Sequence, residues 1–193
     1  SSVYGNNDKV PFSETDAVDH PISPYAATKK ACELMTHTYH HLYNISVTCL
    51  RFFTVFGPRQ RPDLAIATFL SRLANDQTIL VFGDGSMSRD YTYVDDIVSG
   101  IIAAIDRCGS GPGYRIYNLG NENPISLGDL IATIENVTGK RARIERRRVQ
   151  PGDVRRTWAD ITLARSELEY RPSTSLEAGI AKQWDWVQKH SQG

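Results

Sequence analysis

A strand-like run follows directly after a long helical pattern, and this order restricts the possible folds more than any other feature. Residues 24–43 place apolar side chains at helical spacing, whereas Ile45 to Phe53 is rich in β-branched and aromatic residues. The alternation continues, with strands expected at 78–82, 91–94, 114–119 and 140–149, and helices at 63–75, 96–106, 127–138, 160–168 and 176–189. Strands that alternate with helices predict an α/β fold with a mainly parallel sheet.

Capping signals predict where some of these elements begin and end. Ser126 is a typical N-cap for the helix over residues 127–138, and Gly139 is a typical stop. Asp95 is expected to cap the helix over residues 96–106 in the same way. Residues 1–5 are expected to form the end of a buried strand.

Composition excludes several classes of protein. The 193 residues carry 22 basic and 22 acidic side chains, so a zero net charge argues against nucleic acid or an anionic membrane as the main partner. Three widely spaced cysteines favour a reducing compartment over a disulfide framework. No apolar run of spanning length and no secretory leader pattern occur, so we expect a cytoplasmic location. His37 and His41 lack a third ligand at matching spacing, and we expect no metal site.

Tyr25 and Lys29 form a Tyr-x-x-x-Lys pattern just inside a helix start. Ser23 can serve as the N-cap and Pro24 suits the first helical position, so Tyr25 and Lys29 share one helix face. An ammonium beside a phenol favours the phenolate, which can take a proton from a sugar hydroxyl while hydride leaves the same carbon. An ordinary amphipathic helix also carries such a pair by chance, so its meaning depends on the accompanying motifs.

Those motifs occur in a fixed order along the chain: Ser1-Ser2-Val3-Tyr4-Gly5, Tyr25-x-x-x-Lys29, Leu50 to Pro58, Gly83-Asp84-Gly85 with Arg89-Asp90-Tyr91, Tyr93 to Asp96, Tyr117 to Gly120, and Pro151-Gly152-Asp153 with Ala159-Asp160. Together they resemble the extended short-chain dehydrogenase/reductase family, specifically its nucleotide-sugar epimerases. The resemblance implies the C-terminal part of a doubly wound parallel-sheet (Rossmann-type) domain plus a smaller α/β substrate-binding domain. Residues 1–57 and 91–120 would belong to the dinucleotide-binding domain, and residues 58–90 and 121–193 to the UDP-sugar domain.

The resemblance further implies an NAD cofactor. Family members open with a Gly-x-x-Gly-x-x-Gly loop that holds the NAD pyrophosphate, and this sequence has no such loop, so we expect it to correspond to about the C-terminal three-fifths of a member. Tyr25 would be the catalytic base, Lys29 would hold the nicotinamide ribose, and Phe52 would lie near the cofactor. A homodimer through the Tyr25 helix is expected, and the absent N-terminal half is a further potential partner.

The residues beside the pattern suggest which reaction is catalysed. Family dehydratases carry Asp-Glu, and decarboxylases Ser-Glu, where this chain has Ser1-Ser2, so hydride removal and return without elimination is expected. Thr54 stands where galactose epimerases place Asn, and this resembles UDP-glucuronate 4-epimerases. The hydroxyls of Ser1, Ser2 and Thr54 can surround a sugar carboxylate. The alternative is that the serines only end a strand and that Thr54 is a β-branched strand residue.

The remaining motifs concern the nucleotide. By resemblance, Arg89 pairs with the diphosphate, Phe82 lies against the uracil, Asp153 accepts from the ribose hydroxyls and Arg61 lies near the diphosphate. The ordinary alternatives are a surface arginine, a core phenylalanine and a turn aspartate. The sequence therefore predicts an NAD-dependent UDP-glucuronate 4-epimerase, with UDP-glucose/UDP-galactose epimerisation or a catalytically silent UDP-binding fragment as alternatives.

Overall fold

The computed structural model describes residues 1–111, 113–148 and 154–190. A short 3-10 helix, η1, opens the chain at Ser2–Tyr4. The α-helices are α1 (Pro24–Tyr43), α2 (Ala65–Ala74), α3 (Val94–Gly109), α4 (Leu127–Thr138), α5 (Thr162–Glu167) and α6 (Leu176–His190). The strands are β1 (Val47–Phe52), β2 (Thr54–Phe56), β3 (Ile79–Phe82), β4 (Ser88–Tyr93), β5 (Tyr114–Leu119), β6 (Pro124–Ser126) and β7 (Ile144–Arg147).

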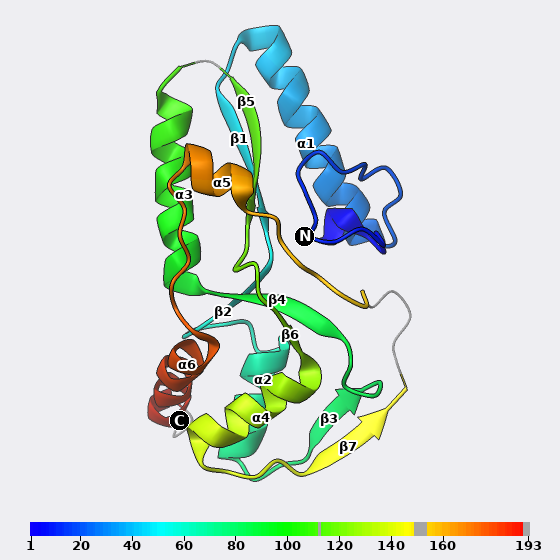
Figure 1. Ribbon diagram of the computed structural model, residues 1–193, viewed down its shortest axis with the longest axis vertical. Coiled ribbons are helices and arrows are strands. Elements are labelled where there is room, and N and C mark those ends of the chain that lie inside the picture. Colours follow the sequence, from blue (N-terminus) through cyan, green and yellow to red (C-terminus); the bar gives the residue numbers. More distant parts are fainter. Residues whose placement is uncertain (112, 149–153, 191–193) are drawn as a thin grey trace.

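The molecule is elongated and its elements gather in two lobes (Figure 1). In the upper lobe β1 and β5 lie side by side, with α1 on one side and α3 and α5 on the other. The lower lobe contains α2, α4, α6 and the β3–β7 pair. Strands β2, β4 and β6 form a small sheet where the lobes meet. No helix in the described part of the chain is both long and apolar enough to cross a membrane.

The predicted α/β class is confirmed, and most strand pairs are parallel. β1 pairs with β5, β2 with β4 and β3 with β7 in parallel, whereas β4 and β6 are antiparallel. Instead of one broad sheet, the described residues form three small ones. The separation follows from the chain path, because only Phe53 separates β1 from β2 and redirects the strand into the second sheet.

Each lobe has its own hydrophobic cluster. Tyr117, Leu119 and Ile161 are fully buried in the upper cluster, while Leu70 and Ile180 are fully buried in the lower one. The segment from residue 159 to residue 170 packs in the upper cluster, although the sequence-based division assigns it to the UDP-sugar domain. The domain ranges therefore stay a prediction, and the packing divides the chain differently in this segment.

Two helices begin as the capping signals predict. The Ser126 hydroxyl accepts a hydrogen bond from the Asp129 amide at 3.0 Å, and Gly139 ends α4 in a left-handed conformation with φ 68°. The Ser23 hydroxyl accepts from the Ala26 amide at 3.1 Å and caps α1. This cap fixes the first turn of α1, which carries Tyr25.

Two local predictions are wrong. Ser1 to Gly5 do not form a strand, because the Tyr4 amide bonds the Ser1 carbonyl at 3.1 Å and the Gly5 amide bonds the Ser2 carbonyl at 3.2 Å, and these local bonds wind the segment into η1. Asp95 does not cap α3. That helix begins two residues earlier than predicted, at Val94 with Tyr93 as the N-cap residue, so Asp95 already lies within its first turn.

Candidate functional site

The predicted Tyr–Lys pair lies together at the start of α1. The Lys29 ammonium nitrogen is 5.3 Å from the centre of the Tyr25 ring, and 62% of Tyr25 is exposed. Figure 1 shows that α1 starts beside η1 and runs toward the upper end of the molecule, opposite to β1. The first turn of α1 is therefore on the side of the lobe toward which β1 and β5 run, which is where open α/β sheets bind ligands.

Ser1, Ser2 and Phe52 meet at the same end of the sheet. Phe52 is the last residue of β1, and its carbonyl accepts a hydrogen bond from the Ser1 backbone nitrogen at 2.7 Å. Ser2 opens η1, and the Phe52 side chain is 39% exposed. The structure thus brings the predicted serines to the carboxyl end of β1.

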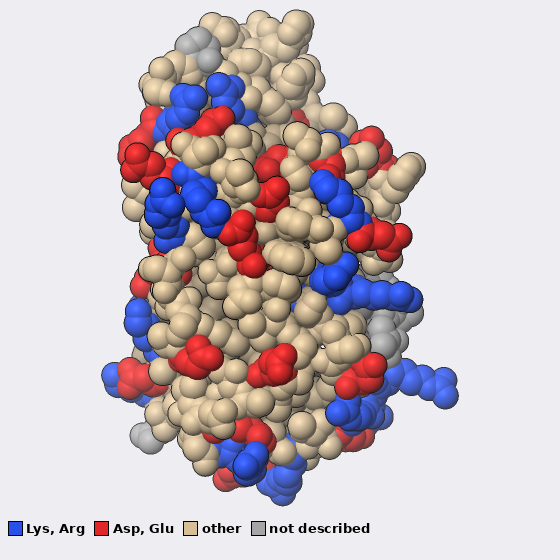
Figure 2. All heavy atoms as spheres, viewed as in Figure 1, with Lys and Arg blue, Asp and Glu red and all other residues tan. Residues whose placement is uncertain are grey.

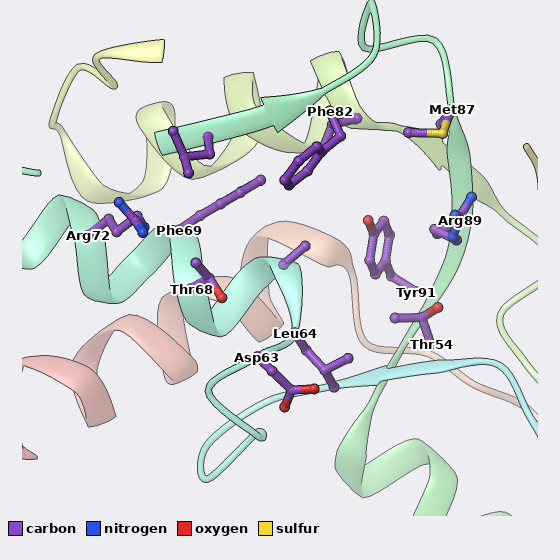
Figure 3. A pocket seen from close by; sticks show the side chains of 13 residues that line it. Thr54, Asp63, Leu64, Thr68, Phe69, Arg72, Phe82, Met87, Arg89 and Tyr91 are labelled. Atoms are coloured by element: carbon purple, nitrogen blue, oxygen red, sulfur yellow. The ribbon is translucent and has the colours of Figure 1, made fainter. Parts of the chain in front are cut away.

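A cavity of about 480 Å³ lies in the lower lobe (Figure 3). It is enclosed by α2 with the loop before it, by the end of β3 and by β4. Three predicted substrate-binding residues, Thr54, Phe82 and Arg89, line it. Figure 3 shows the rings of Phe82 and Phe69 extending into the cavity from different walls. The cavity therefore combines the apolar rings of Phe69 and Phe82 with the guanidinium of Arg89.

Strand register places the polar lining residues next to one another. Thr54 of β2 stands opposite Tyr91 of β4. Arg89 is two residues before Tyr91, so both side chains project from the same face of β4. Thr54 follows Phe52 by two residues, and it therefore links the cavity to the end of β1 where Ser1 lies.

Other lining residues were not singled out from the sequence. Asp63, Leu64, Thr68, Phe69, Arg72 and Tyr91 are the main ones. Arg72 donates to the Thr78 carbonyl at 2.8 Å, which holds the end of α2 against the start of β3. The helical pattern over residues 63–75 predicts an apolar face here, but it gives no sign that this face borders a cavity.

Arg61 is not among the described residues that line the cavity. Arg61 is exposed, and its guanidinium forms two hydrogen bonds to Asp63, at 2.8 and 3.1 Å. These bonds lower the pKa of Asp63, whose side chain does line the cavity. Asp153 lies outside the described residues. The predicted roles of both residues stay predictions.

Two further features of the described residues concern charge and metal ligands. Figure 2 shows acidic and basic side chains interspersed over one face, without a large region of one sign. The described residues contain no group of three or more His, Cys, Asp or Glu side chains that could hold a metal.

Comparisons with known proteins show which family the chain resembles. The sequence matches the family model described as GDP-mannose 4,6 dehydratase over residues 1–183. Protein CapI of Staphylococcus aureus and UDP-glucuronate 4-epimerase 5 of Arabidopsis thaliana are each 45% identical to it, over 96% of this chain and over 60% and 46% of their own lengths. The solved UDP-glucuronic acid 4-epimerase of Bacillus cereus, in complex with UDP-glucuronic acid and NAD, is 37% identical with a TM-score of 0.90, over 98% of this chain and 59% of that one.

The α/β fold is that of the C-terminal portion of UDP-sugar epimerase structures. The chain belongs to the NAD-dependent epimerase/dehydratase family, where it lies close to the UDP-glucuronate 4-epimerases. It spans between 46% and 60% of the lengths of the two curated relatives.

Proposed function

We propose that this chain is the substrate-facing portion of an NAD-dependent 4-epimerase that interconverts UDP-glucuronate and UDP-galacturonate. One observation carries the proposal: the chain runs directly from the end of β1, near Ser1 and Tyr25, to the cavity of the lower lobe. Phe52 ends β1 beside Ser1, and Thr54 lines the cavity two residues later. The relatives named as UDP-glucuronate 4-epimerases support the choice of sugar. Below, "the full-length enzyme" means this chain together with the N-terminal segment that its relatives have.

Tyr25 and Lys29 carry the chemistry in this proposal. Both side chains are exposed on one helix face, as a base and a ribose ligand must be. Tyr25 takes the proton of the C4 hydroxyl and later returns it, and the Lys29 ammonium, 5.3 Å from the centre of the Tyr25 ring, holds the nicotinamide ribose. When bound beside Tyr25 and Lys29, NAD would supply the acceptor and donor of the C4 hydride, so that the net reaction would be redox-neutral.

The fit to NAD is partial in this chain. Tyr25, Lys29 and the exposed Phe52 suit the nicotinamide end of a dinucleotide at the carboxyl end of β1. The sequence has no glycine-rich loop for the pyrophosphate. We therefore assign the pyrophosphate site to the N-terminal segment of the full-length enzyme.

The cavity would hold the nucleotide part of the substrate. Arg89 would pair with the diphosphate through its planar guanidinium, and Phe82 would lie against the uracil. Arg61 and Asp153 would act at the edge, on the diphosphate and the ribose. The hydroxyls of Ser1, Ser2 and Thr54 would hold the sugar carboxylate, a group that UDP-glucose lacks.

The first experiment measures turnover of UDP-glucuronate and of UDP-glucose by the full-length enzyme, with products separated by chromatography. We expect UDP-galacturonate from the first substrate and a lower kcat/KM for the second. Preference for UDP-glucose would reassign the enzyme to the glucose/galactose class. Binding of UDP with no turnover of either sugar would instead favour a silent UDP-binding protein.

Replacing Tyr25 by Phe separates catalysis from binding. Removal of the base should lower kcat by about 100- to 10,000-fold. The dissociation constant for UDP, measured by calorimetry, should not change, because Tyr25 is not among the residues that line the cavity. Tyr43→Phe is the matched control, since Tyr43 is a similarly exposed tyrosine at the other end of α1. Full activity in Tyr25→Phe would contradict the assigned role.

A further inference from the structure

A buried ion pair joins α1 to β1. The Arg51 guanidinium donates to both carboxylate oxygens of Glu33, from Nε at 2.7 Å and from Nη2 at 2.9 Å. Only 4% of the Arg51 side chain and 8% of the Glu33 side chain are exposed. Lys30 also approaches this carboxylate, with its ammonium 3.4 Å away. Two parallel bonds between planar groups fix the direction of the helix relative to the strand.

The network continues into η1 and β5 through Tyr4. The remaining Arg51 nitrogen, Nη1, donates to the Tyr4 hydroxyl at 2.9 Å, and this hydroxyl donates to the Asn118 side-chain oxygen at 2.7 Å. The proton direction is defined, because a guanidinium can only donate. Burial raises the pKa of Tyr4 to about 12, so its hydroxyl keeps the proton that it gives to Asn118.

This network is a buried anchor of α1. Of the 20 residues of the helix, only Ala26 and Glu33 are buried, so apolar packing contributes little to its placement. Glu33 follows Lys29 by four residues and Tyr25 by eight, which puts all three on one side of the helix. Lys29 and Tyr25 are exposed and cannot hold the helix themselves.

Each member of the network shares a segment with residues of the proposed site. Glu33 lies on the helix of Tyr25 and Lys29, Arg51 directly precedes Phe52, and Tyr4 lies in η1 with Ser2. We propose that Glu33, Arg51 and Tyr4 are positioning residues that hold the Tyr25 helix in register with Ser1-Ser2 and with the end of β1. This inference rests on the proposed function and adds to it a requirement for fixed geometry.

The decisive variant removes both charges at once. Breaking one partner leaves a buried charge unpaired and destabilises a protein, whereas replacing both by neutral groups of similar size is often tolerated. We therefore combine Glu33→Gln with Arg51→Met in the full-length enzyme. The matched control is Glu135→Gln with Arg141→Met, a Glu–Arg pair at 2.9 Å in the lower lobe in which Arg141 is exposed.

We expect the double variant to keep its unfolding temperature and its dissociation constant for UDP, while kcat falls about 10- to 100-fold, as a base misplaced by about 1 Å would cause. A purely structural network would lower the unfolding temperature and leave kcat per folded molecule unchanged. An unchanged kcat in the folded double variant therefore overturns the proposal.

Tyr4→Phe decides the question if the double variant does not fold. The change removes only the hydroxyl that links Arg51 to Asn118, and we expect a lower kcat with an unchanged UDP dissociation constant. Amide hydrogen exchange gives a readout without turnover, because exchange in residues 24–43 should rise while that of α4 stays constant. If amide exchange in α1 of Tyr4→Phe equals that of the wild type, the positioning role is overturned. If exchange in α1 rises as expected but the wild-type enzyme turns over neither sugar, only the proposed function is contradicted.

Discussion

Asp90 holds three segments together from one buried side chain. Its carboxylate accepts hydrogen bonds from the Asn121 amide at 2.7 Å and from the Ala159 amide at 3.0 Å, and the residue itself is fully buried in β4. Its own amide donates to the Thr157 hydroxyl at 3.0 Å. Burial raises the pKa of this carboxyl above its ordinary value, although the amide bonds partly oppose the shift. Asp90 thus fixes the strand segment that presents Arg89 and Tyr91 to the cavity.

The raised pKa predicts a specific pH dependence of stability. Between the ordinary value of 3.8 and the raised value, the folded protein binds the Asp90 proton more tightly than the unfolded chain. Stability contributed by this group therefore increases as the pH falls through that window, and it is constant above the window. The free energy of unfolding of the full-length enzyme should rise relative to that of Asp90→Asn as the pH is lowered into this range. Parallel stability curves for the two proteins, from denaturant unfolding at each pH, would refute this.

The loop between β2 and α2 is held by a single residue of α6. Gln183 is almost fully buried, and its side-chain oxygen accepts from the Gly57 amide at 2.9 Å while its nitrogen donates to Gln60 at 3.0 Å. Gly57 has φ 140°, and a Cβ there would lie 2.7 Å from Val94, so the loop requires glycine at this point. The loop ends at Asp63 and Leu64, which line the cavity.

Loss of the Gln183 side chain should therefore weaken nucleotide binding indirectly, through the loop that carries Asp63 and Leu64. In Gln183→Leu the Gly57 amide is left without its partner, which costs about 1–3 kcal/mol of stability. We expect the dissociation constant of the full-length enzyme for UDP to rise several-fold, measured by calorimetry. Gln188→Leu is the matched control, because Gln188 is exposed on the same helix. Equal affinities in the two variants would show that the loop does not shape the cavity.

The sequence predicts those elements whose signals are local. The limits of α4 follow from Ser126 and Gly139, and the strand over residues 114–119 matches β5. The start of α3 could not be predicted from Asp95. Asp95 and Asp96 are adjacent, and aspartate is a favoured N-cap residue at either position. The structure uses Asp96 instead to accept from the Ser173 and Thr174 amides, at 3.2 and 3.1 Å. Contacts between residues more than 70 positions apart leave no local pattern.

The sequence likewise predicts the site residues that belong to motifs, but not those that reach the cavity only through tertiary packing. Tyr25, Lys29, Thr54, Phe82 and Arg89 belong to recognisable motifs, and the structure places the first two together and the last three in one cavity. Residues such as Arg72 and Phe69 become lining residues only because β3 and β4 fold over α2, which no spacing within the helix reveals. Arg61 was also predicted by resemblance, but it pairs with Asp63 and is not among the described lining residues.

The outer surface of α1 remains largely uncovered in this structure. Leu34, Met35 and Leu42 are each about three-fifths exposed, at 59%, 61% and 62%. Such a concentration of apolar surface on one helix is typical of a protein interface. It is consistent with the homodimer through the Tyr25 helix that the family resemblance leads us to expect.

A charge at the centre of this surface should separate the subunits. We expect Leu34→Asp to convert the full-length enzyme from a dimer to a monomer, because an ionised carboxylate cannot be buried without a partner. Sedimentation velocity measures the change. Ile105→Asp serves as the control, since Ile105 is a similarly exposed apolar residue on α3, at 64%. If Leu34→Asp remains dimeric, the interface lies elsewhere.

Two of the described chain crossings between the lobes are very short. A single buried residue, Phe53, separates β1 from β2, and β4 passes into α3 with no residue between Tyr93 and Val94. Crossings this short and this well packed restrict the relative rotation of the lobes. We therefore expect the two lobes to move as one block during a catalytic cycle, so that the sugar ring must swing between its two orientations inside a frame that does not open for it.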